Sequence, residues 1–118
     1  MSDWYCDGST YKNGQPGQDS SCLVFYPDGK VERSHIGDVS NNYAESWAIF
    51  LAACSANNGD TIFTDSTTSY NWIYKSKKPK YDFILETIKL LGFKKIKVAL
   101  IRRDKNKAGI EIERCPFY

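Results

Sequence analysis

The order of strand and helix patterns in this 118-residue sequence predicts an α/β domain with a mixed five-stranded sheet and helices on both faces. Three strand patterns come first and are joined by short turns, which predicts an antiparallel meander. Helical patterns then alternate with two further strand patterns, which is typical of crossovers between parallel strands. The length suits one domain, so we expect residues 1–118 to form a single unit.

Turn residues separate the first three predicted strands, which span residues 3–7, 21–26 and 30–36. A Gly/Pro/Asn cluster lies at 12–20, between the first and second strands. Pro-Asp-Gly at 27–29 is a strong hairpin signal between the second and third.

The spacing of apolar residues changes at Asn41 from the strand pattern to the helical pattern. The same kind of pattern predicts the elements that follow. Local start and stop signals give their expected ends. In chain order we expect a helix over 41–56, a strand over 60–64, a helix from Ser66 or Thr67 to 75, a helix opened by Pro79 and ended by Gly92, a strand over 95–101, and a helix capped by Asn106 and ending near 113.

Composition favours a soluble protein. No apolar run approaches the roughly 20 residues of a membrane span, and the first residues lack the basic and apolar regions of a signal peptide. We therefore expect a cytoplasmic protein without a membrane partner. No protein partner is evident, and we expect a monomer.

The sequence contains four cysteines, without a C-x-x-C pair, and a single histidine, His35. A zinc site is hard to build from these residues. We expect buried free thiols, with two disulfides as the alternative, and we expect His35 to be a strand surface residue. The cysteines are Cys6, Cys22, Cys54 and Cys115.

Charge is divided unevenly along the chain. Residues 1–74 contain three basic and nine acidic side chains, whereas residues 75–107 contain twelve basic and three acidic ones. This division predicts an acidic cluster on one part of the surface and a basic face on another. A solvated, lysine-rich helix face is the simpler explanation of the second segment.

Three acidic residues occupy informative positions. Asp7 ends the first predicted strand, Asp65 ends the fourth, and Glu45 lies in the first turn of the long helix. If the two strands are neighbours, their aspartates meet at one edge of the sheet, where the helix can bring Glu45 close. Clustered carboxylates repel one another unless a cation is present, and Mg²⁺ or Mn²⁺ suits such oxygen ligands.

Each of these acids also has a simpler interpretation. Glu45 could complete a capping arrangement with Asn42, three residues earlier. Asp65 could cap the next helix, and Asp7 with Gly8 could form a plain turn.

Three short segments around these acids carry a resemblance to a known family: residues 5–9 (YCDGS), 41–45 (NNYAE) and 64–66 (TDS). Together, on these elements and in this order, they resemble ribonuclease H of type 1, within the ribonuclease-H-like superfamily. The resemblance covers about residues 3–101 and implies the ribonuclease-H-like arrangement of the mixed sheet.

The resemblance implies that Asp7, Glu45 and Asp65 are catalytic and hold two Mg²⁺ or Mn²⁺ ions about 4 Å apart. It implies an endoribonuclease that hydrolyses the RNA strand of RNA/DNA hybrids to a 5′-phosphate and a 3′-hydroxyl. No covalent intermediate is needed.

The resemblance also implies a way to distinguish RNA from DNA. Asn41 and Asn42 align with the family's pair that contacts the 2′-hydroxyl, and the backbone at Gly8 and Ser9 matches the close approach beside the first aspartate. Helix capping is the simpler role of the two asparagines.

A lysine-rich segment at 75–80 follows the fourth-strand aspartate and could bind the phosphates of the DNA strand. We expect Lys77 and Lys78 to make these contacts and Trp72 to pack on deoxyribose. Buried packing is the alternative role for Trp72. The segment is shorter than the basic protrusion of longer family members.

The family places an asparagine and, four residues later, a fourth acid at the start of its last helix. Asn106 fits the first position, but Ile110 occupies the second. We expect Glu113, on the same helix face as Ile110, to reach back to the metals, giving an enzyme that is slow in Mg²⁺ and improved by Mn²⁺. Asn106 is the second candidate, as a neutral oxygen ligand.

Two other functions compete with this hypothesis. A ribonuclease-H-like binding module that has lost turnover would explain the missing fourth acid. A DNA endonuclease of the superfamily, such as a resolvase-like enzyme, would not need the asparagine pair.

Overall fold

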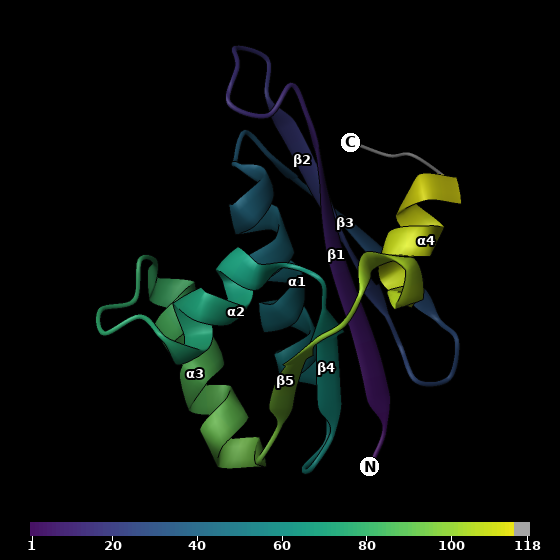
Figure 1. The fold of residues 1–118 in the computed structure, drawn as a ribbon, viewed down its shortest axis with the longest axis vertical. Helices are drawn as coiled ribbons and strands as arrows, with labels where there is room; N and C mark the ends of the chain where they lie inside the picture. The colour runs from purple at the N-terminus through teal and green to yellow at the C-terminus, as the bar shows by residue number, and fades with distance from the viewer. Residues whose placement is uncertain (115–118) are drawn as a thin grey trace.

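One mixed five-stranded sheet organises the chain (Figure 1). In the computed structural model, which describes residues 1–114, the strand order is β3-β2-β1-β4-β5. Strand β2 is antiparallel to β1 and β3, whereas β1, β4 and β5 are parallel. The strands are β1 (Asp3–Tyr11), β2 (Asp19–Phe25), β3 (Val31–Gly37), β4 (Thr61–Thr64) and β5 (Lys97–Leu100).

The helices follow the predicted order, with one short addition. They are α1 (Asn41–Ser55), α2 (Thr67–Tyr74), α3 (Asp82–Lys94) and α4 (Lys107–Arg114), and the 3-10 turn η1 (Arg103–Lys105) precedes α4. The predicted α/β class and mixed sheet are therefore confirmed. Within residues 1–114, no helix has both the length and the apolar character needed to cross a membrane.

Helices cover both faces of the sheet. The Sγ of Cys6 in β1 donates to the carbonyl of Ala48 in α1, at 3.4 Å. The next residue, Asp7, faces Gly109 of α4, since a Cβ built on that glycine would lie 3.0 Å from Asp7 Oδ2. Successive side chains of a strand point to opposite faces, so α1 and α4 lie on opposite sides of β1 (Figure 1).

The end of β1 differs from the sequence prediction in a way that matters for the site. β1 continues past Asp7 to Tyr11, because its pairing with β2 extends to Tyr11 opposite Asp19. The prediction that Asp7 and Gly8 form a plain turn is therefore wrong. Instead, Asp7 lies within a strand that has neighbours on both sides.

Helix α3 begins and ends later than predicted. It starts at Asp82 rather than Pro79, because Tyr81 has extended backbone angles. It passes through Gly92 and ends at Lys94, where Lys95 takes the left-handed conformation that closes the helix. The Lys94 ammonium donates to three carbonyls at the end of α1, at 2.9–3.0 Å, which favours the two extra residues.

The core lies between the sheet and α1, with Ile49, Ile62 and Val98 among its buried residues. Cys6 and Cys22 are buried free thiols there, as predicted, and burial raises the pKa of Cys22 to about 12. The expectation of burial is wrong for Cys54, which is a free thiol exposed near the end of α1. Cys115 lies outside the described residues.

A buried carboxylate fixes the start of β1 beside β4. Asp60 is 2% exposed and accepts hydrogen bonds from the Ser2 N–H, the Trp4 indole N–H and the Asn57 N–H, each at 2.9 Å. Burial alone would raise the pKa of Asp60, but these donors hold it below its ordinary value of 3.8. Asp60 therefore stabilises the register of the two strands that carry the candidate site.

We expect Asp60→Asn to lower the free energy of unfolding at neutral pH by about 1–3 kcal/mol, because the amide NH₂ would face an N–H donor. The pKa of Asp60 is lowered in the folded state, so its stabilisation is complete above the ordinary value and is lost as pH falls below it. Urea unfolding at several pH values measures this. The exposed Asp38→Asn is the control, and equal losses from both variants would contradict the assignment.

Candidate metal centre

Parallel pairing of β1 with β4 brings two aspartates together. Cys6 lies opposite Thr64 in the register, so Asp7 and Asp65 each follow a residue of this last pair. Neighbouring strands lie about 4.8 Å apart, which places the two carboxylates within reach of one metal ion. The two aspartates were expected to meet if strands one and four are neighbours, and the strand order meets this condition.

The third carboxylate, that of Glu45, can lie beside the two aspartates because Gly8 has no side chain. A Cβ at Gly8 would lie 2.7 Å from the Glu45 nitrogen and 2.9 Å from the Ala44 carbonyl carbon. Both are backbone atoms, which cannot move without shifting α1. Glycine therefore permits the close approach of α1 to β1 that sets Glu45 beside Asp7.

The N-terminal ends of α1 and α2 are not capped by Glu45 or Asp65. Ser40 caps α1 by accepting from the Tyr43 N–H at 3.2 Å, and Ser66 caps α2 by accepting from the Ser69 N–H at 3.1 Å. The capping interpretations of Glu45 and Asp65 are therefore wrong.

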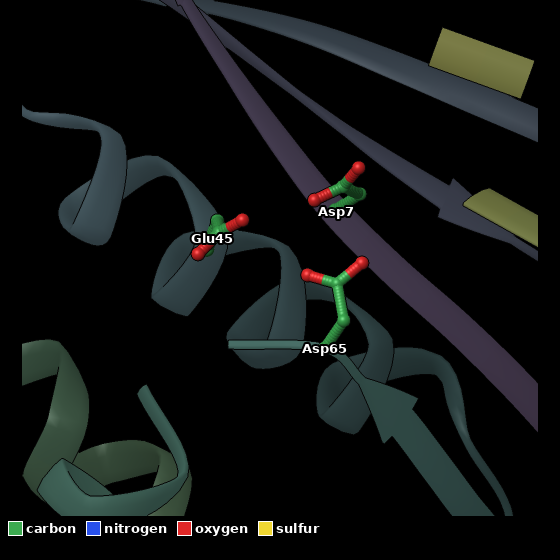
Figure 2. Close-up of side chains that lie close together, drawn as sticks. All are labelled: Asp7, Glu45 and Asp65. Atoms are coloured by element: carbon green, nitrogen blue, oxygen red, sulfur yellow. The ribbon is translucent and has the colours of Figure 1, made fainter. Parts of the chain in front are cut away.

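The three carboxylates surround a common centre (Figure 2). One oxygen from each of Asp7, Glu45 and Asp65 lies within 4.8 Å of the others. Asp7 is only 5% exposed, and the other two are half-buried. Three converging carboxylates form a set of hard oxygen donors, which suits a divalent cation such as Mg²⁺ or Mn²⁺.

The electrostatics of Asp7 reflect this crowding. Burial, then the negative charge of Asp65, and then a hydrogen bond and repulsion from Glu45 raise the pKa of Asp7 to about 8. The Gly8 N–H donates to Asp7 Oδ1 at 2.9 Å and opposes the rise only in part. Without a cation, the cluster therefore retains a proton at neutral pH.

Burial also raises the pKa of Glu45, and the charge of Asp65 adds to this effect. Hydrogen bonds from Asp7 and Ser66, together with the positive charge of Arg103, act in the opposite direction. Asp7 and Glu45 thus share a proton as a pair, and a bound cation would replace that proton.

Asn106 supports the cluster from the α4 side and is fully buried. Its amide nitrogen donates to the Cys6 carbonyl at 2.9 Å and to Asp65 Oδ2 at 3.1 Å, while its oxygen accepts from the Ala108 N–H at 3.1 Å. The two backbone partners fix this orientation. Asn106 caps α4, as predicted. Its amide nitrogen faces Asp65 and its oxygen accepts from the α4 backbone, so its suggested role as a neutral metal ligand stays a prediction.

The helical phase of α4 differs from the prediction by one residue. Gly109, not Ile110, faces the carboxylates, and Ile110 is 44% exposed. The prediction that position 110 faces the carboxylates is therefore wrong. Glu113 does line the pocket beside the site, since it lies one turn beyond Gly109. Its carboxylate lies 3.7 Å from Arg103 and outside the three-carboxylate group, so its role as a metal ligand stays a prediction.

An open pocket of about 520 Å³ adjoins the carboxylates. Asn41 lines this pocket and accepts a hydrogen bond from the Thr10 hydroxyl at 3.2 Å, whereas Asn42 is exposed and is not part of the lining. The lining residues are Asp7, Gly8, Ser9, Thr10, Asn13, Asn41, Glu45, Arg103, Ile112 and Glu113.

The predicted DNA-strand residues lie apart from this pocket. Lys77 and Lys78 are exposed in the loop between α2 and α3, which projects beyond the helix ends (Figure 1). Trp72 is half-buried, with its ring 5.8 Å from that of Tyr81 and the Lys80 ammonium 5.2 Å above it. His35 is an exposed residue of β3, as predicted.

Sequence reasoning missed Arg103, Asn13 and Gly109 as residues of the site. A signal existed for Arg103, because it follows β5, a strand parallel to β4, and must emerge at the edge where Asp65 lies. Asn13 lies in the β1–β2 turn and accepts from the Asn41 N–H at the start of α1, at 3.1 Å. Local patterns do not predict such a long-range contact.

Comparison with protein-family models found no matching family, and comparison with curated proteins found no significantly similar sequence. The description of the site therefore rests on the geometry of its residues. The site is a cluster of three carboxylates, contributed by β1, by α1 and by the residue that follows β4, at the carboxyl end of β4 and beside an open polar pocket.

We expect Asp7→Asn to raise the stability of the metal-free protein at pH 7, by roughly 2–4 kcal/mol. The folded state holds the Asp7 proton up to about pH 8, whereas the unfolded chain releases it near 3.8. Wild-type stability should therefore fall as pH rises between these values, and the fall should be smaller in the variant, where only the raised pKa of Glu45 remains. Thermal unfolding in EDTA measures it, with Asp38→Asn as control. A strong loss of stability in Asp7→Asn at pH 7 would contradict this electrostatic account.

Proposed function

We propose that this protein is a metal-dependent endoribonuclease that hydrolyses the RNA strand of RNA/DNA hybrids. The observation that carries the proposal is the convergence of Asp7, Glu45 and Asp65 beside a pocket lined by Asn41. These residues come from the strand, helix and strand on which the resemblance to type 1 ribonuclease H depends.

The donor set fits Mg²⁺ or Mn²⁺, because both ions favour carboxylate oxygens and the cluster has an excess of negative charge. Asp7, Glu45 and Asp65 would hold the metal, and Asn106 would keep Asp65 oriented through its hydrogen bond. When bound, divalent cations neutralise phosphate charge and lower the pKa of water.

The proposed hydrolysis adds the oxygen of one water molecule to phosphorus and breaks the bond from phosphorus to the 3′-oxygen. The products are a 5′-phosphate, which carries the oxygen of the water, and a 3′-hydroxyl, which receives one of its protons. The protein contributes position: α1, β1 and β4 hold the carboxylates in place before substrate arrives.

Recognition of RNA would depend on the pocket wall formed by Gly8, Ser9 and Asn41. An amide side chain can donate to and accept from a 2′-hydroxyl, a group that DNA lacks. The hydrogen bond from Thr10 orients the Asn41 amide. Asn42, exposed on the same helix turn, would contact a neighbouring ribose.

The DNA strand would lie toward the α2–α3 loop, where Lys77 and Lys78 can contact phosphates without sequence preference. Partial exposure of Trp72 leaves room for contact with deoxyribose, although its ring also packs on Tyr81.

One observation favours a second candidate, a binding module with impaired catalysis. The α4 position that faces Asp7 is Gly109, so it offers no fourth carboxylate. Such a protein would bind hybrids without cleaving them.

The test is incubation of labelled RNA/DNA hybrid, duplex RNA and duplex DNA with the protein, in Mg²⁺ and in Mn²⁺. We expect cleavage of the RNA strand of the hybrid alone, faster in Mn²⁺, and loss of at least 100-fold of the rate (roughly the contribution of one group that stabilises charge) in Asp65→Asn. Asp104→Asn, an exposed acid on η1, is the matched control and should cleave normally.

Other outcomes of this test separate the alternatives. Binding of the hybrid without cleavage in either metal would favour the impaired module. Equal cleavage of duplex DNA would favour a DNA endonuclease, and an unchanged rate in Asp65→Asn would contradict the proposed site.

A further inference from the structure

Arg103 brings a positive charge to the pocket beside the carboxylates. It lies in η1, directly after β5, and lines the same pocket as Asp7 and Glu45. Because β5 runs parallel to β4, the segment that follows it emerges at the sheet edge where the carboxylates lie.

The balance of charge in the pocket singles out this residue. Among described residues of the lining, Asp7, Glu45 and Glu113 are acidic, whereas Arg103 alone is basic. A nucleic acid entering here brings negative phosphates toward negative side chains. Arg103 is therefore the lining residue with the charge to attract a phosphate.

Arg103 forms a weak ion pair with Glu113. Its Nε lies 3.7 Å from Glu113 Oε1, which is longer than a charge-assisted hydrogen bond of about 2.7–2.9 Å. The two side chains are 77% and 66% exposed, and ion pairs of this kind contribute about 0–1 kcal/mol. Exchanging Glu113 for another anion therefore costs little.

We propose that Arg103 binds a phosphate of the RNA strand in the pocket, exchanging its contact with Glu113 for the phosphate oxygens. This inference rests on the proposed function and assigns Arg103 a role in substrate binding. A guanidinium presents a planar fork of N–H donors that matches two phosphate oxygens, which an ammonium cannot do.

The chain offers a closely matched control. Arg102 precedes Arg103 in the same segment and is similarly exposed, at 79%. Its guanidinium donates to Asp104 at 3.1 Å, and it does not line the pocket. A variant of Arg102 removes the same charge from nearly the same place without removing the proposed contact.

The experiment measures hybrid binding by fluorescence anisotropy in EDTA, across a range of salt concentrations, so that the readout does not depend on cleavage. We expect Arg103→Gln to weaken binding about 3–10-fold and to reduce the salt slope by about one. Arg103→Lys should keep most of the slope but recover only part of the affinity. Arg102→Gln should match wild type, and Glu113→Gln should bind at least as tightly as wild type.

Failure of this inference differs from failure of the proposed function. If wild type binds the hybrid and Arg103→Gln weakens binding no more than Arg102→Gln, Arg103 has no specific phosphate contact and the inference is wrong. If wild type binds none of hybrid, duplex RNA and duplex DNA in EDTA, this inference is wrong, whereas the cleavage test in Mg²⁺ and Mn²⁺ decides the proposed function. Circular dichroism of each variant checks that the fold is retained.

Discussion

The parallel pairing of β1 with β4 is the constraint on which the rest of this structure depends. It sets Asp7 beside Asp65, and these two carboxylates form one group with Glu45. Asp60 secures the start of the pair through its three buried hydrogen bonds. Gly8 then allows α1 to approach β1 closely enough for Glu45 to complete the cluster.

The cluster opposes folding electrostatically and would be stabilised by a cation. Burial and mutual repulsion make full ionisation of the three carboxylates unfavourable, as the raised pKa values of Asp7 and Glu45 indicate. Asn106 ties Asp65 to the cap of α4 but contributes no charge. The stability lost at the carboxylates is offset by the core and the hydrogen bonds around them, an arrangement expected of a site kept for function.

The elements of the sheet could be predicted because local signals specify them: turn residues separate the strands of the meander, and helical spacing marks α1. The meeting of the three carboxylates depended on a non-local condition, the pairing of β1 with β4, and Asp7 was expected at the end of its strand but lies within it. Gly109 could not be assigned from local signals, and Arg103 could be assigned only from the parallel order of β4 and β5. In a helix, an error of one residue in choosing the inward-facing position turns the expected face by about 100°. The expected position, Ile110, is for this reason an exposed side chain. The exposure of Cys54 likewise depends on packing around the end of α1.

The central claim is that Asp7, Glu45 and Asp65 together bind a divalent cation. Isothermal titration calorimetry of Mn²⁺ into the protein tests it most directly, in buffers of different ionisation enthalpy so that proton release is measured as well. We expect saturable binding with release of a proton near neutral pH, and loss of this binding in Glu45→Gln but not in Glu86→Gln, an exposed residue of α3. Absence of saturable binding to the wild type, or equal binding by Glu45→Gln, would contradict the claim.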